Sequence, residues 1–186
     1  WFVSVEKIRE RMVELNNETH WVPGFIGEKR FSNWLANARD WAISRNRYWG
    51  SCIPVWININ DPEDLICLGS IEELETLSGE KITDLHKHFL DDVEIEIEGK
   101  KYKRTPEVLD CWFESGSMPY GQQHYPFENK ELFNEGFPAD FIAEGLDQTR
   151  GWFYTLTVLS VALFDSVAFK NCITTGMILA EDGRKM

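Results

Sequence analysis

The feature that most constrains this fold is a strand–helix–strand pattern near the end of the sequence. Ala139 to Ala143 is a short apolar run between a proline and a glycine, which predicts a buried strand. Asp147 to Phe164 is apolar nearly all round, which predicts a helix packed between other elements. Asn171 to Leu179 is β-branched and apolar and predicts a second buried strand. The pattern is a βαβ unit, which implies parallel strands, a right-handed crossover and an α/β fold.

The residues before this unit predict two helices, a strand and an insertion. Apolar residues recur at helical spacing from Val3 to Leu15, and Asn33 to Ile43 predicts a second helix. Ile53 to Ile59 predicts a strand. Residues 58–107 predict a surface insertion that begins with an acidic helix capped by Ser70.

The second part of this insertion predicts a β-hairpin. From Val93 to Glu98 apolar residues alternate with glutamates, which is the two-residue period of a strand with one wet face. A turn at Gly99-Lys100 follows. Lys101 and Lys103 then return opposite the glutamates, where pairs of opposite charge support a hairpin.

The composition excludes several classes of protein. The 186 residues carry a formal net charge of −12, from 31 acidic and 19 basic side chains, which argues against phosphate binding over the whole surface. The aromatic content of 13% argues against disorder. No apolar run reaches the roughly 18 residues of a membrane span, and no signal-peptide pattern is visible. The four cysteines lie far apart without a CxxC pair, so we expect reduced thiols in an intracellular protein and no protein-bound zinc.

Polar side chains cluster where the first strand of the βαβ unit ends. Ligands of open α/β sheets bind at the carboxyl ends of the strands. Glu144 and Asp147 would meet there, with Gly145 allowing close approach of a ligand and Gln148 beside them. Two carboxylates at this edge can accept hydrogen bonds from ribose hydroxyls or from an ammonium group. The alternative is that Asp147 only caps the helix and that Glu144 is solvated.

Two tryptophans form a second candidate site. Trp112 and Trp152 each lie beside a polar segment that contains glycine, residues 114–117 and 148–151. Two indoles could wall an apolar pocket for a small side chain. The alternative is an ordinary place in the hydrophobic core.

The second strand leads to a third group of candidates. Thr175, Gly176 and Met177 lie near its end, and Lys185 follows a predicted turn at residues 182–184. A basic loop beside a nucleotide could neutralise phosphates during phosphoryl or nucleotidyl transfer. The alternative is a solvated charge. We assign no ligand role to the histidines.

Taken together, five strings resemble the isoleucyl-tRNA synthetases, which are class I aminoacyl-tRNA synthetases. The strings are Thr19 to Trp21, Arg45 to Pro54, Val108 to Tyr120, Phe137 to Tyr154 and Ala180 to Met186. They cover nearly the whole chain and occur in the same order as in the family. Their amino-acid sequences resemble those of the eukaryotic cytosolic branch.

The resemblance implies a Rossmann-type catalytic domain. It implies activation of L-isoleucine with ATP and its Mg²⁺ to isoleucyl-adenylate, followed by transfer to tRNA(Ile) in the cytoplasm. It leaves open membership of a multi-synthetase complex and implies no contact with a membrane.

The resemblance also assigns a role to each candidate residue. Four residues would contact the adenylate through its ribose and its ammonium group: Glu144, Gly145, Asp147 and Gln148. Two indoles would wall the isoleucine pocket: those of Trp112 and Trp152. Three residues would lie against adenine through their backbone: Gly176, Met177 and Ile178. Lys185 would be the first lysine of the catalytic KMSKS loop.

Three segments of that domain follow from the resemblance. Residues 1–57 would be the exit from an editing insertion and the return to the catalytic core, residues 58–107 an inserted helix-and-hairpin subdomain, and residues 108–186 the second half of the Rossmann domain, ending inside the KMSKS loop. The family's His-x-Gly-His element does not occur here, and only Lys185 and Met186 of KMSKS are present. We therefore expect that this fragment alone does not activate isoleucine.

Two alternative functions remain at this point. A valyl- or leucyl-tRNA synthetase would share the string at residues 45–50 but differ around Trp112 and Trp152. A non-catalytic interaction module would serve as a scaffold in a synthetase complex or as a nucleic-acid-binding appendage. The net charge of −12 argues against the nucleic-acid version.

Overall fold

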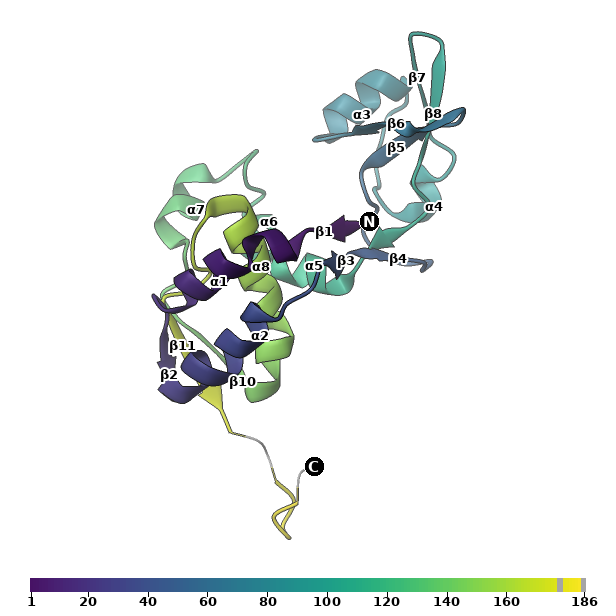
Figure 1. Cartoon of the computed structure of the whole chain (residues 1–186). Coiled ribbons are helices and arrows are strands. Elements are labelled where there is room, and N and C mark those ends of the chain that lie inside the picture. Colours follow the sequence, from purple (N-terminus) through teal and green to yellow (C-terminus); the bar gives the residue numbers. More distant parts are fainter. Residues whose placement is uncertain (177–178, 185–186) are drawn as a thin grey trace. The chain divides into compact units, whose positions relative to one another are not determined.

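The computed structural model describes residues 1–176 and 179–184 (Figure 1). The chain divides into two compact units. Unit 1 comprises Trp1 and Ala42–Cys111, and unit 2 comprises Phe2–Trp41 and Trp112–Met186. Each unit has a hydrophobic core of its own. The assignment of three segments to parts of a longer catalytic domain stays a prediction.

Unit 2 is built on a three-stranded parallel sheet in the order β10–β11–β2. The strands are β10 (Ile142–Gly145), β11 (Asn171–Thr175) and β2 (His20–Val22). Both pairings are parallel, which confirms the predicted βαβ unit and the α/β class. The third strand, β2, was not predicted, because the local pattern around it resembled a loop with Pro23 and Gly24.

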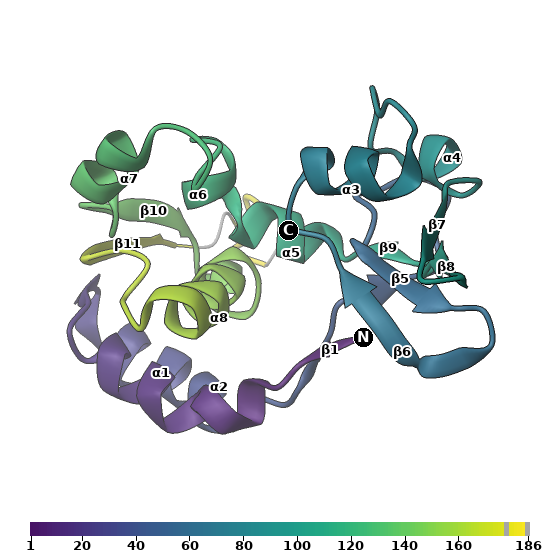
Figure 2. The same cartoon turned by 90° about the horizontal axis from the view of Figure 1, so that it is seen from above.

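Helix α8 (Trp152–Phe164) is packed between other elements, as its apolar surface predicts. Figure 2 shows strands β10 and β11 on one side of α8, and helices α1 (Arg9–Asn16) and α2 (Ser32–Ala36) on the other. Side chains from all these layers except β10 make up the buried core of the unit, and the half-buried Ile142 of β10 packs against it. The sheet and α8 therefore form one rigid support for the loops at the sheet edge.

The strands of this sheet are buried on one face only, whereas the sequence predicted strands buried throughout. Cys172 and Trp21 lie beneath the helices, while the neighbouring side chains of Val22, Ala143 and Ile173 are exposed. The exposed residues share one row, because Ala143 pairs with Ile173 and Ile173 pairs with Val22.

Several predicted boundaries are wrong by a few residues. The first helix begins as a 3-10 turn, η1 (Val5–Ile8), before α1. The second ends at Ala36 rather than Ile43, because Trp41 lies in strand β3 (Trp41–Ala42) and packs its ring against Phe113. The long helix is interrupted, since η3 (Leu146–Arg150) is a separate 3-10 turn before α8.

Unit 1 contains a four-stranded antiparallel sheet in the order β6–β5–β8–β7. The strands are β5 (Val55–Asn58), β6 (Asp61–Cys67), β7 (Glu94–Ile97) and β8 (Lys100–Arg104). The hairpin of β7 and β8 was predicted from its charge pattern and is confirmed.

The acidic helix of unit 1, α3 (Ile71–Ser78), begins where the sequence predicted. The Ser70 Oγ accepts a hydrogen bond from the backbone N–H of Glu73 at 3.1 Å, so the serine is its N-cap. Leu74 on this helix and Ile95 on β7 are buried in the core of the unit.

The remaining elements are short. In unit 1 they are β4 (Ser44–Arg45), β9 (Val108–Leu109) and α4 (Lys87–Leu90). In unit 2, which contains all of α5 except its first residue, they are β1 (Phe2–Val3), η2 (Ile26–Phe31), α5 (Cys111–Gly116), α6 (Met118–Gly121) and α7 (Lys130–Gly136).

Two further observations concern the cysteines and the length of the apolar helices. All four cysteines are free thiols. Over residues 1–176 and 179–184, no helix has both the length and the apolar character that a membrane crossing requires.

Candidate functional site

The carboxyl ends of three parallel strands meet at one edge of unit 2. Gly145, the last residue of β10, pairs with Thr175, the last residue of β11, and Glu144 pairs with Thr174. Gly176 therefore follows directly at the same edge. The sheet thus brings Glu144, Gly145 and Gly176 together, as the sequence predicted, and leaves the Glu144 side chain exposed.

The turn η3 follows Gly145 directly and carries Asp147 and Gln148. A Cβ atom at Gly145 would lie 2.5 Å from Oδ1 of Asp147, so any larger residue here would require this carboxylate to move. The Gln148 Nε2 donates a hydrogen bond to Oδ2 of Asp147 at 3.1 Å. The two side chains are therefore held as a pair beside Gly145.

The start of α8 is capped by Gln148 and not by Asp147. The Gln148 Oε1 accepts a hydrogen bond from the backbone N–H of Trp152 at 2.8 Å. This bond satisfies one of the donors that a helix start leaves without an intrahelical partner. The half of the alternative in which Asp147 caps the helix is therefore wrong, whereas the Glu144 side chain is exposed, as the other half held. Asp147 is exposed as well.

Both tryptophans lie next to Gly151, one in the chain and one in space. Trp152 directly follows this glycine, and the Cη2 atom of Trp112 would lie 3.3 Å from a Cβ atom placed there. The Trp152 Nε1 donates a hydrogen bond to the backbone carbonyl of Ser115 at 3.0 Å, which fixes the indole against α5. Trp112 keeps 42% of its surface exposed, so it is not an ordinary core residue.

Helix α5, which carries Trp112, is seated directly on α8. A Cβ atom at Gly116 would lie 2.9 Å from Cδ1 of Leu159 and 3.1 Å from the carbonyl oxygen of Thr155. The absence of a side chain at Gly116 lets the two helices approach closely. This contact brings the helix that carries Trp112 close to the helix that begins with Trp152.

The third group of candidates is only partly described. Met177, Ile178 and Lys185 lie outside the described residues. The turn predicted at residues 182–184 is confirmed: the Arg184 Nε donates a hydrogen bond to Oδ2 of Asp182 at 2.6 Å.

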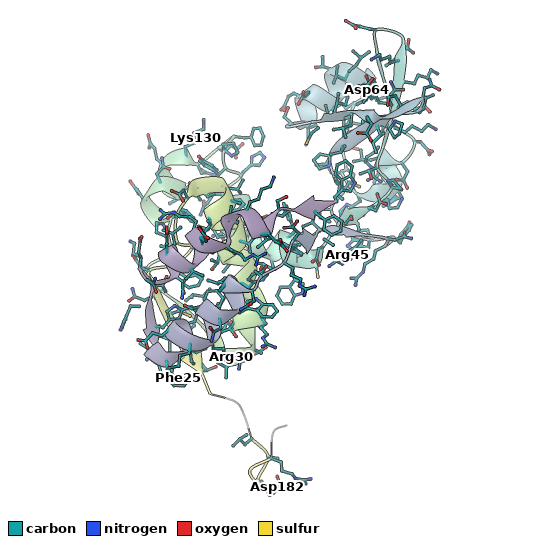
Figure 3. The ribbon with its side chains drawn as sticks, viewed as in Figure 1. Phe25, Arg30, Arg45, Asp64, Lys130 and Asp182 are labelled. Carbon is teal, nitrogen blue, oxygen red and sulfur yellow. The ribbon has the colours of Figure 1, made fainter. Side chains whose placement is uncertain are left out.

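Two residues beside the edge were missed in the sequence. The Arg30 Nε of η2 donates a hydrogen bond to Oγ1 of Thr149 at 3.1 Å, and Thr149 is fully buried within η3. Figure 3 labels Arg30 on unit 2. No sequence pattern could have paired them, because 119 positions separate the two residues.

The arrangement suits a ligand with both hydroxyl and cationic groups. Two exposed carboxylates, those of Glu144 and Asp147, can accept hydrogen bonds, and the Gln148 amide is beside them. Across residues 1–176 and 179–184 no three His, Cys, Asp or Glu side chains are gathered as a metal site requires.

Comparison with known proteins gives one family match. The model for "tRNA synthetases class I (I, L, M and V)" matches residues 1–186. An isoleucine–tRNA ligase of Chlamydia abortus is 62% identical over 186 residues, and one of Protochlamydia amoebophila is 64% identical over 186 residues. Each alignment covers 100% of this chain and 18% of the relative, so the chain spans less than a fifth of the length of these relatives.

These relatives are bacterial, whereas the strings resembled the eukaryotic cytosolic branch. They therefore give no support to that narrower assignment.

Two solved structures share the fold. The agnB2 LeuRS of Agrobacterium radiobacter, in a ternary complex with tRNA and LeuAMS, matches with a TM-score of 0.51 and 21% identity over 80% of this chain and 20% of that chain. The methionyl-tRNA synthetase of Mycobacterium tuberculosis, bound by methionyl-adenylate, matches with a TM-score of 0.55 and 13% identity over 100% of this chain and 28% of that chain. At these identities the likeness concerns the fold alone.

Proposed function

The chain belongs to the class I tRNA synthetases of the I, L, M and V type, and from this premise we propose that it is part of an isoleucine–tRNA ligase. The relatives that are 62–64% identical over all 186 residues bear that name. The structural observation that carries the proposal is the placement of Trp112 and Trp152 next to Gly151. Gly151 follows the exposed residue Asp147 by four positions.

The pair suits the apolar side chain of isoleucine, and the carboxylates suit its ammonium group. Trp112 and Trp152 would wall the side-chain pocket. Glu144 and Asp147 would accept hydrogen bonds from the ammonium group and from the ribose hydroxyls of the adenylate. Gln148, held against Asp147 at 3.1 Å, would complete this contact.

The nucleotide would lie along the edge that Gly145 and Gly176 leave open. The backbone from Gly176 through Met177 and Ile178 would face adenine, and Lys185 would approach the phosphates. Mg²⁺ would enter with ATP as part of the substrate.

The proposed reaction is an in-line displacement at the α-phosphate. A carboxylate oxygen of isoleucine forms a bond to phosphorus, and the bond from phosphorus to pyrophosphate breaks with its electron pair leaving on pyrophosphate. The protein supplies orientation and charge stabilisation, since neither bond change involves a protein atom. A hydroxyl of tRNA(Ile) would then attack the isoleucyl carbonyl carbon in the cytoplasm, and the bond from this carbon to the phosphate oxygen would break, with AMP leaving.

The experiment is isoleucine-dependent ATP–pyrophosphate exchange by the full-length protein that contains this sequence. We expect exchange in the wild type and a fall in kcat/KM for isoleucine of at least about 30-fold in Trp152→Ala, because loss of an aromatic side chain that anchors a ligand costs about 2 kcal/mol or more. The matched control is Trp49→Ala, an exposed tryptophan of unit 1, which should leave exchange unchanged.

The other outcomes separate the alternatives. Exchange with valine or leucine but not with isoleucine would reject the amino-acid assignment and keep the family. No exchange with any of the three amino acids would reject the activity and favour an interaction module.

A further inference from the structure

The turn that carries Asp147 and Gln148 is anchored from its buried side. The next residue, Thr149, has no exposed surface. Its Oγ1 donates a hydrogen bond to the carbonyl oxygen of Leu146 at 2.8 Å and accepts one from the Arg30 Nε at 3.1 Å. One hydroxyl therefore closes η3 upon itself and ties it to η2.

A second contact joins η3 to α2, the helix that directly follows η2. The guanidinium of Arg150, the last residue of η3, lies 4.8 Å from the ring centroid of Trp34 on α2. This is the distance of a cation–π interaction. The Trp34 ring is in turn held edge-on by Tyr154 of α8, with centroids 5.8 Å apart.

The turn from which Arg30 extends is itself fixed by buried hydrogen bonds. The carbonyl oxygen of Gly27 accepts hydrogen bonds from Nδ2 of Asn16 at 3.1 Å and from Oγ of Ser32 at 2.9 Å. The Oδ1 of Asn16 accepts one from Nε1 of Trp21 at 2.9 Å. Since Trp21 lies in β2, this network connects the base of Arg30 to the sheet.

We propose that Arg30 and Thr149 are positioning residues for the amino-acid activation step, an inference that rests on the proposed function. Neither residue lies at the exposed edge. Their hydrogen bond sets the orientation of η3, and η3 in turn places Asp147 and Gln148 beside Gly145.

The physical reason is the shortness of η3. A 3-10 turn of five residues has few hydrogen bonds of its own and weaker geometry than an α-helix. An external bond to a buried hydroxyl therefore decides which way its exposed side chains point. Small displacements of positioned groups cost large factors in rate.

The test uses the full-length enzyme and exchange kinetics with isoleucine. Thr149→Val keeps the shape of the side chain and removes the hydroxyl, and we expect kcat/KM for isoleucine to fall by about tenfold or more. Thr149→Ser keeps the hydroxyl and should remain within about threefold of the wild type.

The chain offers a matched control in another buried threonine. Thr157 on α8 donates a hydrogen bond from Oγ1 to the carbonyl oxygen of Phe153 at 2.8 Å, away from η3. Thr157→Val loses a comparable buried hydrogen bond and should lower thermal stability as Thr149→Val does. It should leave kcat/KM for isoleucine within about threefold.

A double-mutant cycle tests whether Arg30 acts through Thr149. Arg30→Met removes the donor while keeping the length of the side chain. If Arg30 acts only through Thr149, the double variant Arg30→Met, Thr149→Val loses little more than Thr149→Val alone, which also removes the bond to Leu146. Full multiplication of the two losses would overturn the coupling.

A second readout does not depend on activity. Amide hydrogen exchange at residues 146–150 should accelerate in Thr149→Val and not in Thr157→Val, because only the first variant releases η3.

The outcomes separate the two claims. A wild type without isoleucine-dependent exchange would reject the proposed function and this inference with it. An active wild type in which Thr149→Val keeps its kcat/KM, or falls only as far as Thr157→Val does, would reject the inference alone.

Discussion

At the scale of single residues, Gly151 occupies a confined place in the candidate site. A Cβ atom there would lie 2.7 Å from Oε1 of Gln148 and 3.3 Å from Cη2 of Trp112. The first contact is with the cap of α8 and the second with an indole of the proposed pocket. A methyl group at this position would therefore disturb both at once.

We expect Gly151→Ala to raise the KM for isoleucine about tenfold in exchange by the full-length enzyme. The added methyl group must displace the Gln148 side chain or Trp112, and each displacement changes the proposed pocket. Steady-state exchange at varied isoleucine concentration measures this effect.

The control for this substitution is Gly136→Ala. Apart from its chain neighbours and the backbone of its own helix, nothing lies within 4 Å of a Cβ placed at Gly136, at the end of α7, so the KM should not change. An unchanged KM in Gly151→Ala as well would contradict the pocket at this position.

At the scale of elements, the hairpin of β7 and β8 shows how the pattern of charges in the sequence matches the pairing register of the two strands. Glu94 pairs with Lys103 across the two strands, and their Oε1 and Nζ atoms lie 2.9 Å apart. The Lys103 ammonium holds the pKa of the Glu94 carboxyl below its usual range. The pair is exposed, so its effect on stability is small and screened by salt.

We expect Glu94→Gln to lower the melting temperature of the chain slightly at pH 7. Because the folded-state pKa of Glu94 is lowered, its stabilisation is present above the unfolded value of about 4.3. It is lost as the pH falls through the lower folded value. The difference between Glu94→Gln and the wild type should therefore shrink as the pH falls below about 4.3 and vanish once the pH is below the lowered folded value. Thermal unfolding of both proteins at pH 7 and over a series of acidic pH values would show this.

The control is Glu96→Gln on the same strand. Glu96 lies opposite Lys101, whose Nζ lies 3.9 Å from the Glu94 carboxylate. This variant should shift the melting temperature less than Glu94→Gln does. An equal shift in both variants would mean that overall charge, and not the ion pair, sets the stability.

At the scale of the whole molecule, the sequence predicted what is local and missed what is distant. The βαβ unit, the capped helix at Ser70 and the hairpin follow from periods of two or 3.6 residues. Strand β2 is three residues long, and its partner β11 begins at Asn171, so no local period could reveal their pairing.

The candidate site divides in the same way. Glu144, Gly145 and Asp147 were predictable because they follow a strand of recognisable pattern. The cap by Gln148 was not predictable from the sequence. Side-chain amides and carboxylates can both accept a hydrogen bond from the backbone N–H groups at a helix start, and Asp147 and Gln148 are both near it. The bond between Arg30 and Thr149 depends on the packing of η2 against η3 and has no signature in either segment.

We expect the chain of residues 1–186 alone to show no isoleucine-dependent ATP–pyrophosphate exchange. By resemblance, the His-x-Gly-His element contributes to the site, and it does not occur among these residues. The full-length protein, assayed in parallel, is the positive control. Isoleucine-dependent exchange by the 186-residue chain would contradict this expectation.

The cap on α8 has a consequence for how variants of this site must be interpreted. One amide group of Gln148 both secures the first turn of the helix at Trp152 and holds Asp147 in place. A loss of activity on replacing Gln148 would thus mix a folding defect with a recognition defect, and a genetic screen could not tell them apart. Glu144, whose exposed side chain supports no helix start, is the position at which an inherited or selected change would report on recognition alone.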